Sequence, residues 1–126
     1  MKLYRQLASL VAARLNCMAS GNDEWRDKHE SEIERLAKEH LPSGGGFDLG
    51  TQIDLDKSHG NRLVFNTSFH HMNDAGMYDG WTSHQVQVVP DLQFGFDLKL
   101  KGRNRNDINE YIGEVFNLVL DEEVRS

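Results

Sequence analysis

Histidine and aspartate side chains near the middle of the chain could ligate a metal ion. The candidates are His71, Asp79 and His84, which offer the nitrogen and oxygen ligands that zinc takes. If the strands flanking Asp79 share an apolar face, His71 and His84 lie on that face and His70 lies on the other. Two imidazoles, one carboxylate and an open fourth position would suit a metal-dependent hydrolase. No HxH, HExxH or HxD spacing accompanies them, and the alternative is that both histidines end an apolar layer and are hydrogen-bonded there.

Four cations in seven residues form a second chemical feature, at Lys99, Lys101, Arg103 and Arg105. They lead from a predicted strand into the start of a predicted helix. Free N–H groups and the helix dipole attract anions at such a place, and two arginines can clamp a phosphate or a carboxylate. The cluster therefore predicts contact with an anion, a nucleotide or an acidic partner. In the alternative, Arg103 and Arg105 pair with carboxylates of the chain itself.

The segment 72–81 combines methionine, tyrosine and tryptophan with glycine and aspartate, and it is predicted to be a connecting loop. Tyrosine and tryptophan give rigid contact area of the kind that binding surfaces favour. The alternative is that Trp81 folds over the edge of the sheet and belongs to the core. Together with the cationic cluster, this loop gives the predicted binding residues: Tyr78, Trp81, Lys99, Lys101, Arg103 and Arg105.

Other motifs carry no chemistry that can be assigned. The run Gly44–Gly46 leads from a helix to a strand and lacks the GK[ST] of a phosphate-binding loop, so it predicts a flexible connection. Cys17 has no local base, and no serine stands in a G-x-S-x-G turn. We therefore predict no catalytic residue and no cofactor.

The composition is that of one small soluble domain of 126 residues and 14.4 kDa, with a formal net charge of -6. The acidic balance argues against general nucleic-acid binding, which needs a positive contacting face. A single cysteine excludes an intramolecular disulfide and fits a reducing compartment. No apolar run approaches the roughly 18 residues of a membrane span, and the amphipathic N-terminal segment lacks the apolar core of a signal peptide. We therefore expect a cytoplasmic protein without membrane contact.

Hydrophobic periodicity divides the chain into seven elements. Apolar residues at steps of three and four predict helices over 3–18, from Asn22 or Asp23 to about 40, and from about 106 to 121. Alternation with period two predicts strands over 47–55, 63–70, 83–88 and 92–100. The predicted buried stripe of the second helix is Trp25, His29, Ile33, Leu36, Ala37 and His40.

These elements predict an α+β fold in two layers, a four-stranded antiparallel meander with helices packed on one face, in the order α-α-β-β-β-β-α. The single domain 1–126 divides into a helical hairpin (1–41), a glycine-rich connection (42–46), the meander (47–101) and a C-terminal helix (106–121). A two-residue turn at Pro90 would set Val88 opposite Gln93 on the wrong face, so we expect a bulge or a longer loop. Val64 is predicted on the polar face, where its exposure and the open sheet edges favour a homo-oligomer.

Three stretches carry a resemblance to known proteins: RLVFNTSFHHMN (62–73), GMYDGWT (76–82) and GRNRNDI (102–108). On these residues the chain resembles a family of small uncharacterised proteins encoded by bacteriophages and plasmids. The resemblance extends from residue 43 to the last helix. It implies a phage or mobile-element context and, by analogy, an accessory or host-interference role.

The function predicted from these observations is non-enzymatic. The chain is expected to be a phage or mobile-element accessory protein that binds a host protein in the bacterial cytoplasm and interferes with a host or defence process. One alternative is the binding of a nucleotide or another anionic small molecule, with Arg103 and Arg105 on phosphate and Trp81 or Tyr78 stacked on a base. The other is a metal-dependent hydrolase built on His71, Asp79 and His84.

Overall fold

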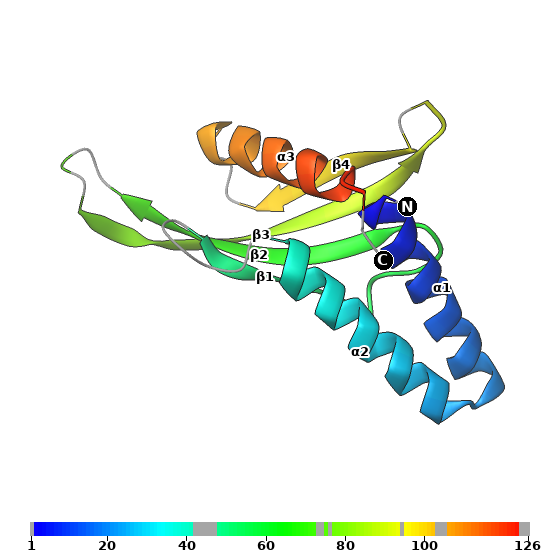
Figure 1. Ribbon diagram of the computed structural model, residues 1–126. Coiled ribbons are helices and arrows are strands. Elements are labelled where there is room, and N and C mark those ends of the chain that lie inside the picture. The colour runs from blue at the N-terminus through cyan, green and yellow to red at the C-terminus, as the bar shows by residue number, and fades with distance from the viewer. Residues whose placement is uncertain are drawn as a thin grey trace.

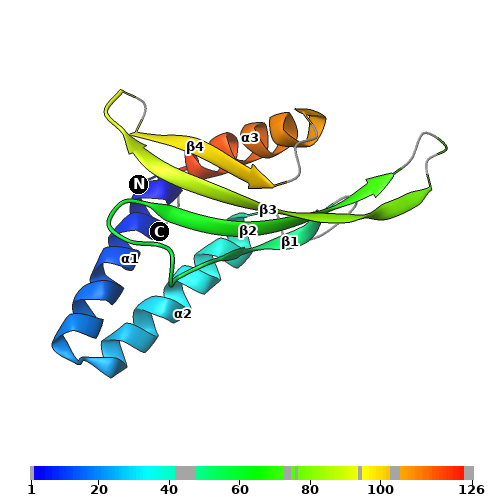
Figure 2. The same cartoon turned by 180° about the vertical axis from the view of Figure 1, so that it is seen from behind.

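A computed structural model describes residues 2–41, 48–72, 75, 77–93, 95–102 and 106–123. The sheet is an antiparallel meander with the strand order β1-β2-β3-β4. Views from opposite sides place the three helices on one face of this sheet (Figures 1 and 2). The predicted α+β meander is therefore confirmed, with these bounds: α1 Leu3–Ser20, α2 Asp23–His40, β1 Asp48–Ile53, β2 Leu63–Met72, β3 Tyr78–Asp91, β4 Gly95–Gly102 and α3 Asn106–Leu120.

The two N-terminal helices form a hairpin with defined caps. α1 ends at Gly21, whose φ of 72° is a left-handed conformation that glycine adopts without strain. The side chain of Asn22 then accepts the N–H of Trp25 at 3.3 Å and so caps α2 where the sequence predicted its start. Trp25 itself was expected in the buried stripe, but its side chain is 51% exposed. The turn between α1 and α2 lies beyond the sheet in both views, so the first turn of α2 has no layer to pack against (Figures 1 and 2).

The core lies between the helices and one face of the sheet. Its centre is Phe65 of β2, whose ring centroid lies 5.6 Å from that of Phe116 in α3. Both side chains are fully buried. The core residues come from the three helices, from the residue directly after α2 and from the helix-facing positions of β2, β3 and β4: Leu3, Tyr4, Leu7, Val11, Ile33, Leu36, Ala37, Leu41, Leu63, Phe65, Val86, Val88, Phe96, Ile112, Phe116 and Leu120.

Val64 lies on the opposite face of the sheet but is only 2% exposed, so its predicted exposure is wrong. The connection after β1 folds against it. Its carbonyl accepts the N–H of Asp54 at 2.7 Å, and its own N–H donates to Ser58 Oγ at 3.0 Å. The Ser58 hydroxyl in turn donates to the Asp54 carbonyl at 2.7 Å. Because Val64 is covered by its own chain, it gives no argument for a homo-oligomer.

The Ser58 hydroxyl gives a testable prediction about this connection. We expect Ser58→Ala to lower the free energy of unfolding by about 1–3 kcal/mol, because the buried N–H of Val64 loses its acceptor. Urea unfolding followed by circular dichroism measures the change. Ser20→Ala is the control: that hydroxyl bonds the Asn16 carbonyl on an exposed helix end, and its loss should change stability by no more than about 0.5 kcal/mol. Equal effects for the two variants would contradict the role assigned to Ser58.

The connection between β3 and β4 is longer than two residues, as expected, but its predicted position at Pro90 is wrong, because β3 continues through Pro90, which pairs with Phe96, to Asp91. Asp91 pairs with Gly95, so three residues separate the strands, and this register places Val88 opposite Leu98 on the helix-facing side. The N–H of Gln93 donates to Asp91 Oδ1 at 2.8 Å within the turn. Gly95 has a φ of 90°, which a residue with a side chain rarely adopts.

Candidate functional site

Among the residues that the structure describes, the two central strands pair further than their neighbours do and form a two-stranded ribbon. β1 pairs with β2 no further than Asp48 opposite Phe69, and β4 pairs with β3 no further than Gly102 opposite His84. We call residues 70–72 of β2 and 78–81 of β3, which pair with each other beyond these points, the ribbon. In Figures 1 and 2 it projects away from the helices at one end of the sheet. Much of the segment that the sequence predicted as a connecting loop is therefore strand, because β2 continues to Met72 and β3 begins at Tyr78.

A bulge in the ribbon brings the two predicted aromatic residues to one face. His70 pairs with Trp81 and Met72 pairs with Tyr78, so β3 has one more residue than β2 between these pairs. Without that extra residue, Tyr78 and Trp81 would occupy positions on opposite faces, since they are three residues apart. The bulge resets the alternation, and both then take register positions on the face that the helices leave free.

This face, which we call the helix-free face, carries polar residues in cross-strand rows next to the ribbon. Because Phe65 and Val86 point into the core, the positions between them belong to the helix-free face. The hydroxyls of Ser68 and Ser83 lie 3.0 Å apart, and Gln87 Nε2 donates to Gln85 Oε1 at 2.9 Å. In order toward the ribbon, the rows are Val64–Gln87–Lys99, then Gln52–Asn66–Gln85–Lys101, then Gly50–Ser68–Ser83.

The structure describes two of the four residues of the predicted cationic cluster, Lys99 and Lys101. Lys99 and Lys101 occupy β4 at the edge of the helix-free face, opposite Gln87 and Gln85. The Lys99 side chain is exposed and makes no ion pair within the described part of the chain. Arg103 and Arg105 lie outside the described residues, and so does the anion site predicted between the end of β4 and the start of α3.

The backbone register separates the three metal-ligand candidates. His84 is 2% exposed and pairs with Thr67 on β2 and Gly102 on β4. His71 lies four positions beyond Thr67, about 13 Å along the strand, and Asp79 lies five positions from His84. His71 and His84 are therefore not brought together as a metal site would require, because His84 pairs with Thr67 and not with a residue next to His71. Among the residues searched, which are the described ones, no three His, Cys, Asp or Glu side chains form a metal-binding group.

Sequence reasoning missed the amide-bearing positions of the helix-free face, Gln52, Asn66, Gln85 and Gln87. Each stands at an alternate position of a predicted strand, opposite in phase to the buried residues. The alternation could have identified these positions, but a polar residue at an alternate strand position usually only faces solvent. The four positions lie side by side because β1, β2 and β3 are neighbours in the sheet, and this strand order is not visible in the alternation itself.

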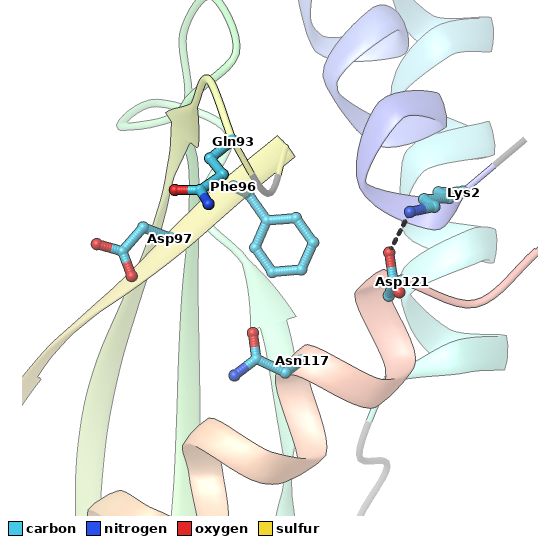
Figure 3. A pocket seen from close by; sticks show the side chains of 6 residues that line it. All are labelled: Lys2, Gln93, Phe96, Asp97, Asn117 and Asp121. Atoms are coloured by element: carbon cyan, nitrogen blue, oxygen red, sulfur yellow. Dashed lines mark ion pairs between the residues drawn. The ribbon is translucent and has the colours of Figure 1, made fainter.

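A separate hollow of about 510 Å³ opens between the start of α1, the β3–β4 turn and the end of α3 (Figure 3). Phe96, whose ring lies 5.0 Å from that of Tyr4, forms its apolar wall, and burial raises the pKa of the Tyr4 phenol. Lys2 Nζ bonds Asp121 Oδ1 at 2.7 Å across its rim. Its lining is Lys2, Gln93, Phe96, Asp97, Asn117 and Asp121, and it shares no residue with the ribbon or with the three rows.

Comparison with protein-family models, with curated proteins and with solved structures finds no match to this chain. Within the part of the chain that the structure describes, none of the helices has the length and apolar character needed to cross a membrane.

Proposed function

We propose that the chain is a non-enzymatic accessory protein of a bacteriophage or another mobile element. It binds a host protein in the bacterial cytoplasm and interferes with a host or defence process. The ribbon is its main contact surface, and Trp81 and Tyr78 are the central contact residues.

The observation that supports this proposal is that, within the described residues, β2 and β3 pair with each other beyond the last pairs made by β1 and β4. A two-stranded hairpin is only marginally stable by itself in water, because it lacks a third strand or a covering layer. A ribbon of this kind is stabilised when a partner covers it. Tyrosine and tryptophan dominate the binding energy of protein interfaces, and both occupy register positions on one face of this ribbon.

Side-chain truncation on the ribbon tests the proposal. In affinity capture from a bacterial lysate, we expect one host protein to bind the wild-type chain and to be lost with Trp81→Ala. With that partner purified, Trp81→Ala should raise the dissociation constant by about 30-fold or more, as removal of a central interface tryptophan does. Isothermal titration calorimetry measures the change.

The chain offers a matched control for this experiment. It has two tryptophans, and Trp25 is 51% exposed on α2, away from the sheet. Trp25→Ala removes the same side chain without touching the ribbon, so it should leave the dissociation constant unchanged. A partner that is retained equally by both variants would show that the ribbon is not the contact surface.

A further inference from the structure

Strand β4 lies at an edge of the sheet, because within the described part of the chain it pairs with β3 alone (Figures 1 and 2). The backbone N–H and C=O groups of successive residues in an edge strand point alternately toward the neighbouring strand and away from the sheet. The N–H of Leu98 bonds Asp97 Oδ1 of its own strand at 2.9 Å, which indicates that Leu98 points away. By alternation, Phe96 and Leu100 also present their backbone groups at the open edge.

The same alternation follows from Val64, on the far side of β3. Its N–H donates to Ser58 and its carbonyl accepts from Asp54, so both groups are used on the side away from β3. Gln87, which lies opposite Val64, must therefore turn its own backbone groups toward β4. Its partner there is Lys99, which faces β3 in return. The residues on either side of Lys99 thus face the open edge.

The side chains of β4 make this edge complementary to a second copy of itself. Asp97 and Lys99 are exposed on the helix-free face on either side of Leu98, and neither makes an ion pair among the described residues. Two copies of β4 that pair antiparallel about a two-fold axis at Leu98 set each Asp97 opposite a Lys99. On the helix-facing side, the same register sets each Phe96 opposite a Leu100. Opposite charges directly across a strand pair stabilise the pairing.

Charge also selects this register over its neighbours. Moving the two-fold axis by one residue along β4 sets either Asp97 opposite Asp97 or Lys99 opposite Lys99. Like charges directly opposite each other are destabilising. Charged residues on an edge strand, lysine above all, also oppose pairing with unrelated strands. A second copy of this chain supplies the matching charge at each of these positions.

The helix-facing side of the edge is incompletely covered. Leu98 and Leu100 are only half-buried and pack at the border of the core. Phe96 forms the apolar wall of the hollow of about 510 Å³ between the β3–β4 turn and the ends of α1 and α3 (Figure 3). In the register centred on Leu98, the Leu100 of the second copy lies beside Phe96, where this hollow leaves space. Burial of these side chains would remove apolar surface from water and so favour association.

We propose that the chain forms a symmetric dimer in which β4 pairs antiparallel with β4 of a second copy, with Leu98 at the two-fold axis. The two four-stranded sheets then form one continuous sheet. The N–H of Leu98 exchanges the Asp97 carboxylate for the Leu98 carbonyl of the second copy, which releases the carboxylate to Lys99 of that copy. The interface shares no residue with the ribbon, so dimerisation goes beyond the proposed contact with a host protein and is independent of it.

Sedimentation velocity of the full chain, from about 5 to about 500 µM, tests the proposal. One strand pair is a small interface, so we expect a dissociation constant of about 10 µM or weaker. Asp97→Lys and Lys99→Asp each replace two attractive pairs with two repulsive ones and should raise the dissociation constant about tenfold or more. The double variant Asp97→Lys/Lys99→Asp restores opposite charges in the same register and should restore dimerisation. Lys101→Gln is the control, because that position lies opposite Gly95 of the second copy and its substitution should change nothing.

Cysteine cross-linking tests the position of the axis, in a Cys17→Ser background. Leu98→Cys sets two thiols on residues whose Cα atoms are about 5.5 Å apart, within the range of a disulfide, so mild oxidation should give a covalent dimer. Leu100→Cys is the matched control: the two copies of this half-buried position lie four residues apart along the strands, about 13 Å, and should not cross-link.

Two kinds of result would overturn the inference. One is a chain that stays monomeric at about 500 µM in sedimentation. The other is a dimer that neither charge reversal weakens, that the double variant does not restore, or that cross-links equally through both positions. Far-ultraviolet circular dichroism of each variant confirms that the chain is folded, so a loss of dimer is read only from folded protein. Loss of the dimer with an unchanged Trp81-dependent host partner would leave the proposed function standing.

Discussion

Replacing Phe116 with alanine should lower the free energy of unfolding by about 3–5 kcal/mol. Phe116 is fully buried, and its ring packs at a tilt against that of Phe65, with 5.6 Å between the centroids. The variant loses the transfer free energy of the ring, leaves a cavity under α3 and loses the aromatic pair, which contributes about 0.5–1.5 kcal/mol beyond area burial. Domains of this kind have roughly 5–15 kcal/mol of stability in total, so this one side chain accounts for a large share.

The same helix supplies the control. Leu118 lies two residues away and is 76% exposed, so Leu118→Ala should change the free energy of unfolding by no more than about 0.5 kcal/mol. Urea unfolding of both variants, with a common slope against urea concentration, measures the difference. Similar losses in the two variants would mean that α3 does not dock on the sheet through Phe116. The helix would then cover a different part of the sheet from the one described.

The layers of this fold could be predicted from the sequence because burial dictates the period of the hydrophobic pattern. Ile112 and Phe116 recur at helical spacing, and Leu63 and Phe65 recur at strand spacing, since each element buries one side only. The predictions that failed concern residues whose environment is set by other segments. Val64 is covered by the connection after β1, and Trp25 is exposed because the helical hairpin extends past the sheet.

The ribbon shows why the candidate site was harder to predict than the fold. The sequence singled out Tyr78 and Trp81 from their residue types, but it placed them in a loop. Their common face depends on one extra residue in β3 between the pairs His70–Trp81 and Met72–Tyr78. A shift of one residue moves a side chain to the opposite face, and no apolar alternation marks the register in this segment. The pairing partner on β2 is therefore needed to assign the face.

Glu30→Ala tests a buried ion pair that holds the helical hairpin to the sheet. Arg14 of α1 has a side chain only 8% exposed, and its Nε donates to Glu30 Oε1 of α2 at 2.7 Å. Its Nη1 donates to the Leu55 carbonyl after β1 at 3.4 Å. Removing the carboxylate leaves a buried guanidinium without its counter-charge, and we expect a loss of about 3 kcal/mol. This is the lower end for broken buried pairs, because Glu30 is 30% exposed and its charge is partly screened by water.

The double variant Arg14→Met/Glu30→Leu separates the cost of breaking the pair from the net contribution of the pair. Burying two charges costs about as much as their attraction returns, so well-packed apolar replacements should unfold within about 1 kcal/mol of wild type or be more stable. Thermal and urea unfolding of the single and double variants measure both quantities. A Glu30→Ala loss below about 1 kcal/mol would show an ion pair that behaves like a surface one. If the double variant is instead as unstable as Glu30→Ala, the loss comes from the missing hydrogen bond between Arg14 and the Leu55 carbonyl. That hydrogen bond would then be the main stabilising contact between the helical hairpin and the connection after β1.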